Sequence, residues 1–93
     1  MGYRKRVDRN QAEIVDALRR TGWHVEDTSS TGRGFPDLVV ARGSRLLLLE
    51  VKDGTKPLYA QALTPAEAMV HRDFAAAGVI VRLVRSVEDV IAL

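Results

Sequence analysis

The sequence predicts an α/β fold, more narrowly an α+β fold in which a small mixed sheet carries helices on its faces. Three observations lead to this prediction: helical periodicity near the start of the chain, two apolar β-type runs separated by Gly43-Ser44, and a continuous apolar run over 79–84. The length of 93 residues and the 46% hydrophobic content fit one globular domain, 1–93. The predicted order is α-β-β-β-α-β-α.

The first half of the chain is predicted to form a helix followed by three strands. Ile14 and Leu18 recur at helical spacing, and Gly22 ends that pattern. Gly43-Ser44 has the composition of a two-residue hairpin turn between two β-type runs. The expected elements are a helix over 9–21, a strand over 23–28, a loop over 29–34, and strands over 37–42 and 45–52.

The second half is predicted to form a helix, a buried strand and a short final helix. Thr64-Pro65-Ala66-Glu67 is a helix start with a hydroxyl at the N-cap and a glutamate at N3. We expect Met69 and Phe74, together with Trp23, to lie in the core. The expected elements are a loop over 53–63, a helix over 65–77, a strand over 79–84 buried on both sides, and a helix that begins at 86–89.

Charge and composition narrow the classes of function. The 14 Lys and Arg outnumber the 12 Asp and Glu only slightly, but Arg4, Lys5, Arg6 and Arg9 cluster at the start. Such a cluster suits a polyphosphate partner such as DNA, although a solvated chain terminus explains it by itself. With no cysteine, disulfides and thiolate metal sites are excluded. We find no apolar run long enough to span a membrane and no secretory signal, so we expect a cytoplasmic protein, bacterial or phage-encoded.

The predicted hairpin brings two carboxylates together. A turn at its tip pairs Arg42 with Arg45, so opposed residue numbers sum to 87 and Asp37 lies across from Glu50. Opposed residues share a face with Cβ atoms about 4.5–5.5 Å apart, and Lys52 shares that face because side chains alternate along a strand. The other expected residues of this face are Val39, Ala41, Leu46 and Leu48.

Such a pair of acids needs a compensating charge. Lys52 supplies one, and a hard cation such as Mg²⁺ held by Asp37, Glu50 and the Val51 carbonyl would supply the rest. The chemistry that fits is phosphodiester hydrolysis, with Lys52 stabilising developing charge or orienting water. Taken separately, a Pro-Asp turn and a Glu-x-Lys strand are equally compatible with solvated charges.

Other residues point to DNA contacts or to structure. Ser30 and Arg33 lie in the loop before Asp37, and Lys56 lies in the long loop after it, so all three are candidate phosphate contacts. Simple turn chemistry explains the first two equally well. Glu67 and His71 have the i, i+4 spacing of a metal pair, but we interpret Glu67 as a capping residue and both as structural.

The motif residues resemble a known nuclease family. Gly34-Phe35-Pro36-Asp37, twelve intervening residues and Glu50-Val51-Lys52 resemble the PD-(D/E)xK signature, and the wider pattern resembles small stand-alone VRR-Nuc proteins. The further matching segments are Asn10 to Ile14, Glu50 to Gly54, Leu63 to Glu67 with His71, and Val84 to Asp89. The resemblance implies a restriction-endonuclease-like αβββαβ core with a short C-terminal helix, Mg²⁺ or Mn²⁺ dependence, and DNA cleavage by structure.

The same resemblance implies a homodimeric Holliday-junction resolvase, since two sites related by a two-fold axis suit a four-way junction. Related resolvases carry a glutamate on the first helix, whose equivalent here, counted back from Gly22, is Gln11 and not Glu13. We therefore predict Gln11 as a supporting catalytic residue and keep Glu13 as the second choice. A buried amide satisfied by backbone explains Gln11 as well.

Two other functions stay open at this point. The chain could be a less selective nuclease for flaps or single strands, or a non-catalytic DNA-binding module whose acids hold a structural metal. Cleavage of a synthetic four-way junction with Mg²⁺, compared with linear duplex and single strands, separates the three.

Overall fold

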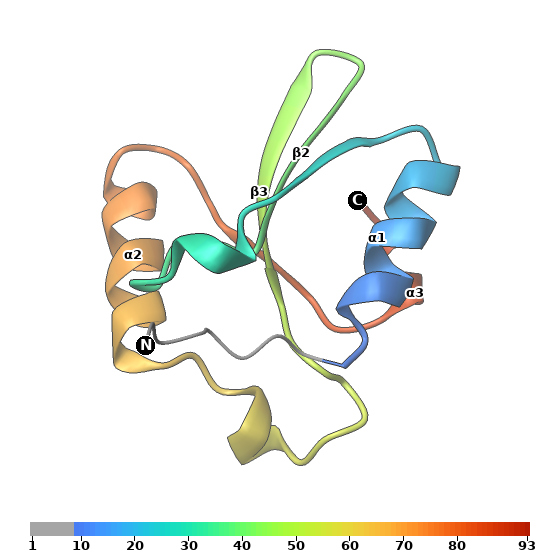
Figure 1. Ribbon diagram of the computed structural model, residues 1–93. Helices are drawn as coiled ribbons and strands as arrows, with labels where there is room; N and C mark the ends of the chain where they lie inside the picture. Colours follow the sequence, from blue (N-terminus) through green and yellow to red (C-terminus); the bar gives the residue numbers. More distant parts are fainter. Residues whose placement is uncertain (1–8) are drawn as a thin grey trace.

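A four-stranded mixed sheet forms the centre of the molecule in the computed structural model, which describes residues 9–93 (Figure 1). The sheet order is β1-β2-β3-β4, with antiparallel pairing in the first two steps and parallel pairing between β3 and β4. The strands are β1 (His24–Asp27), β2 (Leu38–Arg42), β3 (Arg45–Val51) and β4 (Arg82–Val84). The helices are α1 (Gln11–Arg20), α2 (Pro65–Ala76) and α3 (Val87–Ile91), with single 3₁₀ turns η1 (Ser29–Thr31) and η2 (Leu58–Gln61).

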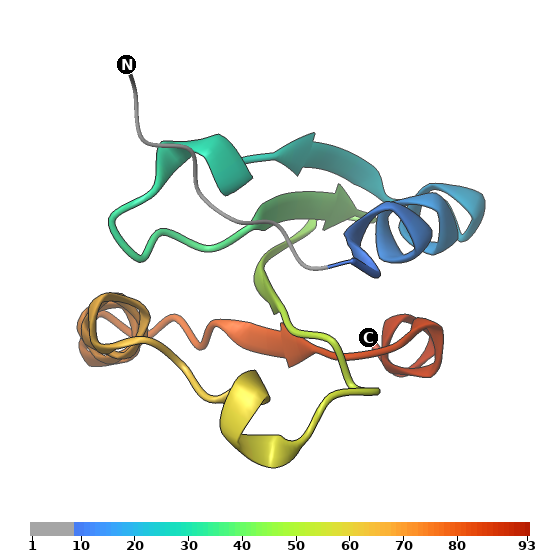
Figure 2. The same ribbon diagram turned by 60° about the horizontal axis from the view of Figure 1, so that its bottom comes forward.

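The helices divide between the two sides of the β2–β3 hairpin. Helices α1 and α3 lie together on one side, and α2 lies alone on the other (Figures 1 and 2). This confirms the predicted α+β class and the αβββαβ order with a short C-terminal helix. No helix within residues 9–93 has the length and apolarity needed to cross a bilayer; the longest, α2, has 12 residues.

The hairpin has the predicted register. Its pairs run from Arg42↔Arg45 to Leu38↔Leu49, so the residue numbers sum to 87 throughout. Gly43 and Ser44 both adopt positive φ, +54° and +68°, as a two-residue turn of the hairpin-compatible type requires. The register ends at Leu38↔Leu49; extending it by one residue would set Asp37 opposite Glu50, and the Asp37 N–H donates to the Leu49 carbonyl at 2.9 Å.

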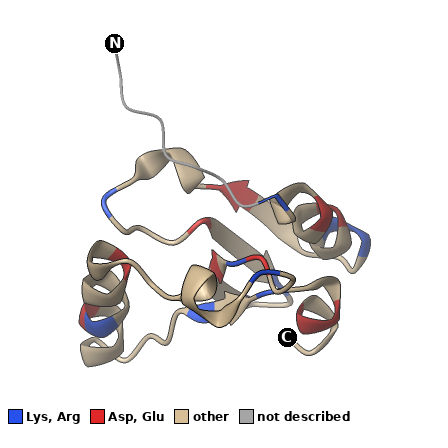
Figure 3. Cartoon of the chain, turned by 90° about the horizontal axis from the view of Figure 1, so that it is seen from below, with Lys and Arg blue, Asp and Glu red and all other residues tan. Residues whose placement is uncertain are grey.

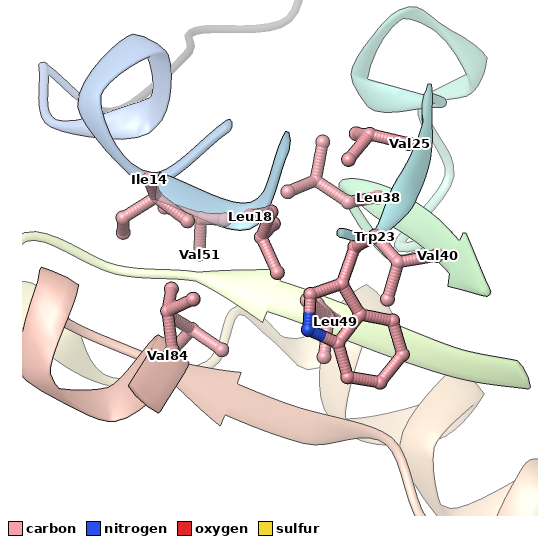
Figure 4. Close-up of a cluster of buried hydrophobic side chains, with 10 residues drawn as sticks. Ile14, Leu18, Trp23, Val25, Leu38, Val40, Leu49, Val51 and Val84 are labelled. Carbon is pink, nitrogen blue, oxygen red and sulfur yellow. The ribbon is translucent and has the colours of Figure 1, made fainter. Parts of the chain in front are cut away.

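The hydrophobic core lies between the sheet and α1 (Figure 4). Ile14 and Leu18 face the sheet at the i, i+4 spacing that predicted this helix. Trp23 closes the core at the end of the helix, as expected, and the Arg42 guanidinium lies 4.4 Å from the centre of its ring. The buried side chains of this cluster are Ile14, Leu18, Trp23, Val25, Leu38, Val40, Leu49, Val51, Val84 and Val90.

The prediction of a strand over 79–84, buried on both sides, is wrong in its length and in its burial. Only Arg82–Val84 is β-structure, because β4 pairs with no more than the last three residues of β3. Val79 and Ile80 precede that pairing and are 41% and 66% exposed. A strand at the sheet edge has one neighbour within the described chain, so an apolar run there need not be covered on both faces.

The prediction for the α2 side is also wrong in part. Met69 is exposed, and Phe74 is half-buried in an edge-to-face contact with Phe35, with ring centres 6.3 Å apart. The buried side chain of α2 is Glu67, a charged residue. Helix α2 therefore adds no residue to the core cluster, and its inward-facing group is polar.

Candidate active site

Three predicted site residues meet where β2 begins and β3 ends. Asp37 is 5% exposed, Glu50 0% and Lys52 8%, so all three are withdrawn from solvent. Val51, between Glu50 and Lys52, turns its side chain into the core, and its backbone N–H donates to Asp37 Oδ2 at 2.9 Å. That bond fixes the Asp37 carboxylate against the end of β3. The structure thus brings together the acids and the lysine that the hairpin register predicted.

Helix α2 adds two residues that sequence analysis had assigned a structural role alone. Lys52 Nζ donates to Glu67 Oε1 at 2.8 Å, and His71 Nε2 lies 3.1 Å from Glu50 Oε1. Their i, i+4 spacing was the available signal, because it places both side chains on one helix face. We use "the acidic cluster" for Asp37, Glu50, Lys52, Glu67 and His71. In Figure 3, Asp and Glu positions (red) lie on α2 and on the segments between α2 and the other helices.

Glu67 keeps its predicted capping role as well. Its Oε1 accepts the Thr64 N–H at 2.9 Å, and its own N–H donates to Thr64 Oγ1 at 3.2 Å, which completes the capping box. The same oxygen that caps α2 therefore also holds Lys52. One side chain joins the first turn of α2 to the end of β3.

Gly34 lets the loop before Asp37 approach α2. Its φ is +82°, and an added Cβ would lie 2.3 Å from the Ala66 carbonyl oxygen and 2.8 Å from the Glu67 nitrogen. Both atoms belong to the backbone of the first turn of α2, so any side chain at this position would clash with that turn. The glycine of the Gly-Phe-Pro-Asp segment thus closes the cluster from the loop side.

Electrostatics keep Glu67 charged. Burial raises the pKa of Glu67, but the hydrogen bonds from Lys52 and from the Thr64 N–H lower it by more. The positive charge of Lys52 and a hydrogen bond with Glu50 act in the same direction. The net pKa lies below the ordinary value, so Glu67 is a carboxylate at neutral pH.

His71 is neutral at the same pH. Burial lowers its pKa, the negative charge of Glu67 raises it, the charge of Lys52 lowers it, and the charge of Asp37 raises it. The net pKa lies below 6.5. The charges of Glu67, Lys52 and Asp37 thus all act on His71.

Gln11 is buried, as predicted, and its amide Nε2 donates to Asp27 Oδ2 at 3.2 Å. Asp27 Oδ1 accepts the Ser29 N–H and hydroxyl, so this carboxylate organises the end of β1. The second choice, Glu13, is exposed on α1. A catalytic role for Gln11 stays a prediction. Its side-chain amide donates to Asp27, which is not a member of the acidic cluster.

Asn10, just before α1, is a residue whose role sequence analysis missed. Its amide Nδ2 donates to the carbonyls of Lys52 and Arg85, at 3.1 and 3.0 Å. These two bonds tie the start of α1 to the ends of β3 and β4. No local pattern reveals them, since they join residues far apart in the chain.

The predicted DNA contacts lie in different places. Ser30 and Arg33 are exposed and line a hollow of about 560 Å³ that also reaches Glu67. Arg9 and Lys56 are exposed as well. The remaining predicted contacts, Arg4, Lys5 and Arg6, lie outside the described residues. The hollow therefore joins two of the seven predicted contacts to the acidic cluster.

The donor set fits a hard divalent cation. Asp37 and Glu50 offer carboxylate oxygens, and the Val51 carbonyl is a further predicted oxygen ligand; Mg²⁺ prefers oxygen and commonly takes one or two carboxylates while retaining waters. Across residues 9–93, no three or more His, Asp or Glu side chains are arranged around a common metal position. That excludes an all-side-chain cage within this part of the chain and is compatible with the two-carboxylate set.

In comparisons with known proteins, no family model matches the sequence and no curated protein is significantly similar to it. The likeness to VRR-Nuc nucleases therefore rests on the motif residues themselves.

Proposed function

We propose that this chain is a metal-dependent DNA endonuclease that hydrolyses phosphodiester bonds. The observation that carries the proposal is the burial of Asp37, Glu50 and Lys52 where β2 begins and β3 ends, with the Asp37 carboxylate bound by the Val51 N–H. Burying two acids and a lysine at one strand end costs desolvation free energy that pairing offsets only in part, which favours a ligand-binding role for them. A phosphate with a divalent cation is the ligand that uses all three.

The residues divide the work by charge. Asp37 and Glu50 would hold Mg²⁺, for which Mn²⁺ would substitute. When bound, the ion would polarise the scissile phosphate and acidify a water molecule. Lys52 places a positive charge next to the two acids, where it would stabilise the extra negative charge of the transition state. The Val51 N–H keeps Asp37 oriented.

We further propose that the substrate is branched DNA, in particular the four-way junction, and that the active form is a homodimer. Ser30 and Arg33 line a hollow that extends to Glu67 of the acidic cluster, and we propose that a DNA strand lies along it. Residues 9–93 carry one such cluster, so we propose that two copies cut two strands symmetrically. We also propose that the protein acts inside a bacterial cell, where its gene is chromosomal or phage-borne.

The direct test is Asp37→Asn assayed on a synthetic four-way junction with Mg²⁺. Asparagine keeps the shape and an acceptor for the Val51 N–H but removes the charge that would hold the cation. We expect junction binding to persist and cleavage to fall by at least about 100-fold. Asp73→Asn, an exposed position on α2, is the matched control and should cleave like wild type. Equal cleavage by the Asp37 variant would refute the assignment.

A substrate panel separates the related functions. Preference for the junction over linear duplex, flaps and single strands supports a resolvase, whereas comparable cleavage of flaps or single strands supports a less selective nuclease. Junction binding with no cleavage in Mg²⁺ or Mn²⁺ would support a binding module instead. Analytical ultracentrifugation at assay concentration tests the dimer.

A further inference from the structure

The ammonium group of Lys52 is held by a residue from another element. Its partner, Glu67 Oε1, lies 2.8 Å away, and the exposed fractions of the two side chains are only 10% and 7%. A lysine has four rotatable bonds and ordinarily keeps its charge in water. At the end of β3 a carboxylate that belongs to α2 holds this side chain.

The same carboxylate oxygen receives the Thr64 N–H at 2.9 Å, so its position is fixed from the helix side as well. A capping glutamate needs no burial to do its work, because the helix end on which it acts can face solvent. Glu67 is nevertheless almost fully buried. Helix capping explains why Glu67 bonds to Thr64. It does not explain why the same carboxylate also contacts the Lys52 ammonium.

Stability is a weak explanation for that approach. Buried ion pairs often contribute no more than apolar residues of similar volume would, because both charges lose their hydration. What is left is the position of the lysine itself.

We propose that Glu67 is a positioning residue that holds the Lys52 ammonium beside Asp37 and Glu50 for phosphodiester cleavage. The inference rests on the proposed nuclease function and adds a residue to it. In this proposal Glu67 acts through Lys52, whose ammonium it holds at 2.8 Å. Loss of the anchor frees the lysine to adopt other rotamers, and small misplacements of a catalytic group cost about 100-fold in rate.

The test is Glu67→Gln, with single-turnover cleavage of a four-way junction as the readout. Glutamine keeps an oxygen for the Thr64 N–H but loses the charge that holds Lys52. We expect kcat to fall by about tenfold to 100-fold with KM and junction affinity unchanged, and with a cooperative melt that shows a folded protein. Glu88→Gln makes the same substitution at an exposed first-turn position of α3 and should cleave like wild type.

A double variant separates positioning from a general structural effect. If Glu67 acts through Lys52, adding Glu67→Gln to Lys52→Ala slows cleavage no further, whereas independent losses would multiply. Where Lys52→Ala cleaves too slowly to measure, the kcat-against-KM split of Glu67→Gln decides. If Glu67→Gln does not fold, Glu67→Asp takes its place: it keeps the charge, shortens the reach by one methylene and is expected to show the same fall in kcat.

The outcomes are distinguishable. Three outcomes would overturn the positioning role and leave the nuclease proposal standing. They are cleavage by Glu67→Gln at the wild-type rate, a rise in its KM alone, and losses that multiply in the double variant. Lys52→Ala that cleaves normally would overturn it too, because there would be nothing to position. No cleavage of any DNA by wild type would refute both proposals together.

Discussion

The two faces of the sheet carry different kinds of side chain. On the α1 side, Leu38 and Leu49 pack with Ile14 and Leu18 into a closed apolar cluster. On the α2 side, the buried side chains include the ionisable Glu50 and Glu67 as well as the apolar Leu48, and Met69 is exposed. Period-two alternation along β2 and β3 produces both faces from one hairpin.

This difference separates the source of stability from the source of chemistry. Burying apolar area stabilises the α1 side at about 25 cal/mol per Å², whereas burying charges on the α2 side returns little or nothing. A buried polar cluster persists when the rest of the molecule outweighs its cost. The α1 face supplies that margin, and the substitutions below test the division.

The largest effect is expected from the α1 face. Leu49→Ala removes a fully buried side chain, 0% exposed, and should destabilise the fold by about 2–5 kcal/mol because it leaves a cavity. Leu46→Ala, on the same strand but 65% exposed, should change stability by no more than about 0.5 kcal/mol. Urea unfolding followed by circular dichroism measures both. Equal losses would show that the two faces do not differ in this way.

The next effect concerns the contact between the loop and α2. Gly34→Ala places a methyl group against the backbone of Ala66 and Glu67, so the first turn of α2 must move. Gly32→Ala is the matched control: its φ is also positive, +71°, but nothing lies within 4 Å of the added Cβ. The backbone cost of positive φ, about 1–2 kcal/mol, is common to both.

We expect Gly34→Ala to be less stable than Gly32→Ala by about 1–3 kcal/mol, the usual cost of overpacking. Denaturant titration of the pair gives that difference. If the nuclease proposal holds, Gly34→Ala should also cleave more slowly, since Glu67 moves with the helix. Equal stability of the two variants would mean that the loop and α2 adjust independently.

Local rules were sufficient for the hairpin and its acids. Gly43-Ser44 fixed the turn, the turn fixed the register, and alternation then placed Asp37 across from Glu50 with Lys52 on the same face. Each step needed only neighbours in sequence or in one strand pair. The start of α2 was predictable for the same reason, because a capping box is a four-residue pattern.

The remainder depended on contacts between distant segments. That Glu67 reaches Lys52 and His71 reaches Glu50 depends on how α2 docks, which no pattern within the helix specifies. The apolar run over 79–84 looked like a buried strand because apolarity does not tell an edge from a centre. Its position beside β3 alone leaves Val79 exposed.

The smallest expected effect is on the pH dependence of folding stability, and it concerns the Asp27 carboxylate on the α1 side of the sheet. Burial raises the pKa of Asp27, but hydrogen bonds from the Ser29 hydroxyl and N–H and from Gln11, with the charge of Arg19, lower it below 3.8. At a pH between the folded-state and unfolded-state pKa values, Asp27 is protonated in the unfolded chain and ionised in the folded one. The carboxylate therefore stabilises the fold fully above pH 3.8, and this contribution disappears as the pH falls through the folded-state pKa. Asp27→Asn should therefore lose stability at pH 7 and converge with wild type in acid, with Asp73→Asn as the control for net charge. Urea midpoints at pH 7, 5 and 3 measure the gap; a gap that stays constant with pH would show that shape, not ionisation, is what Asp27 contributes.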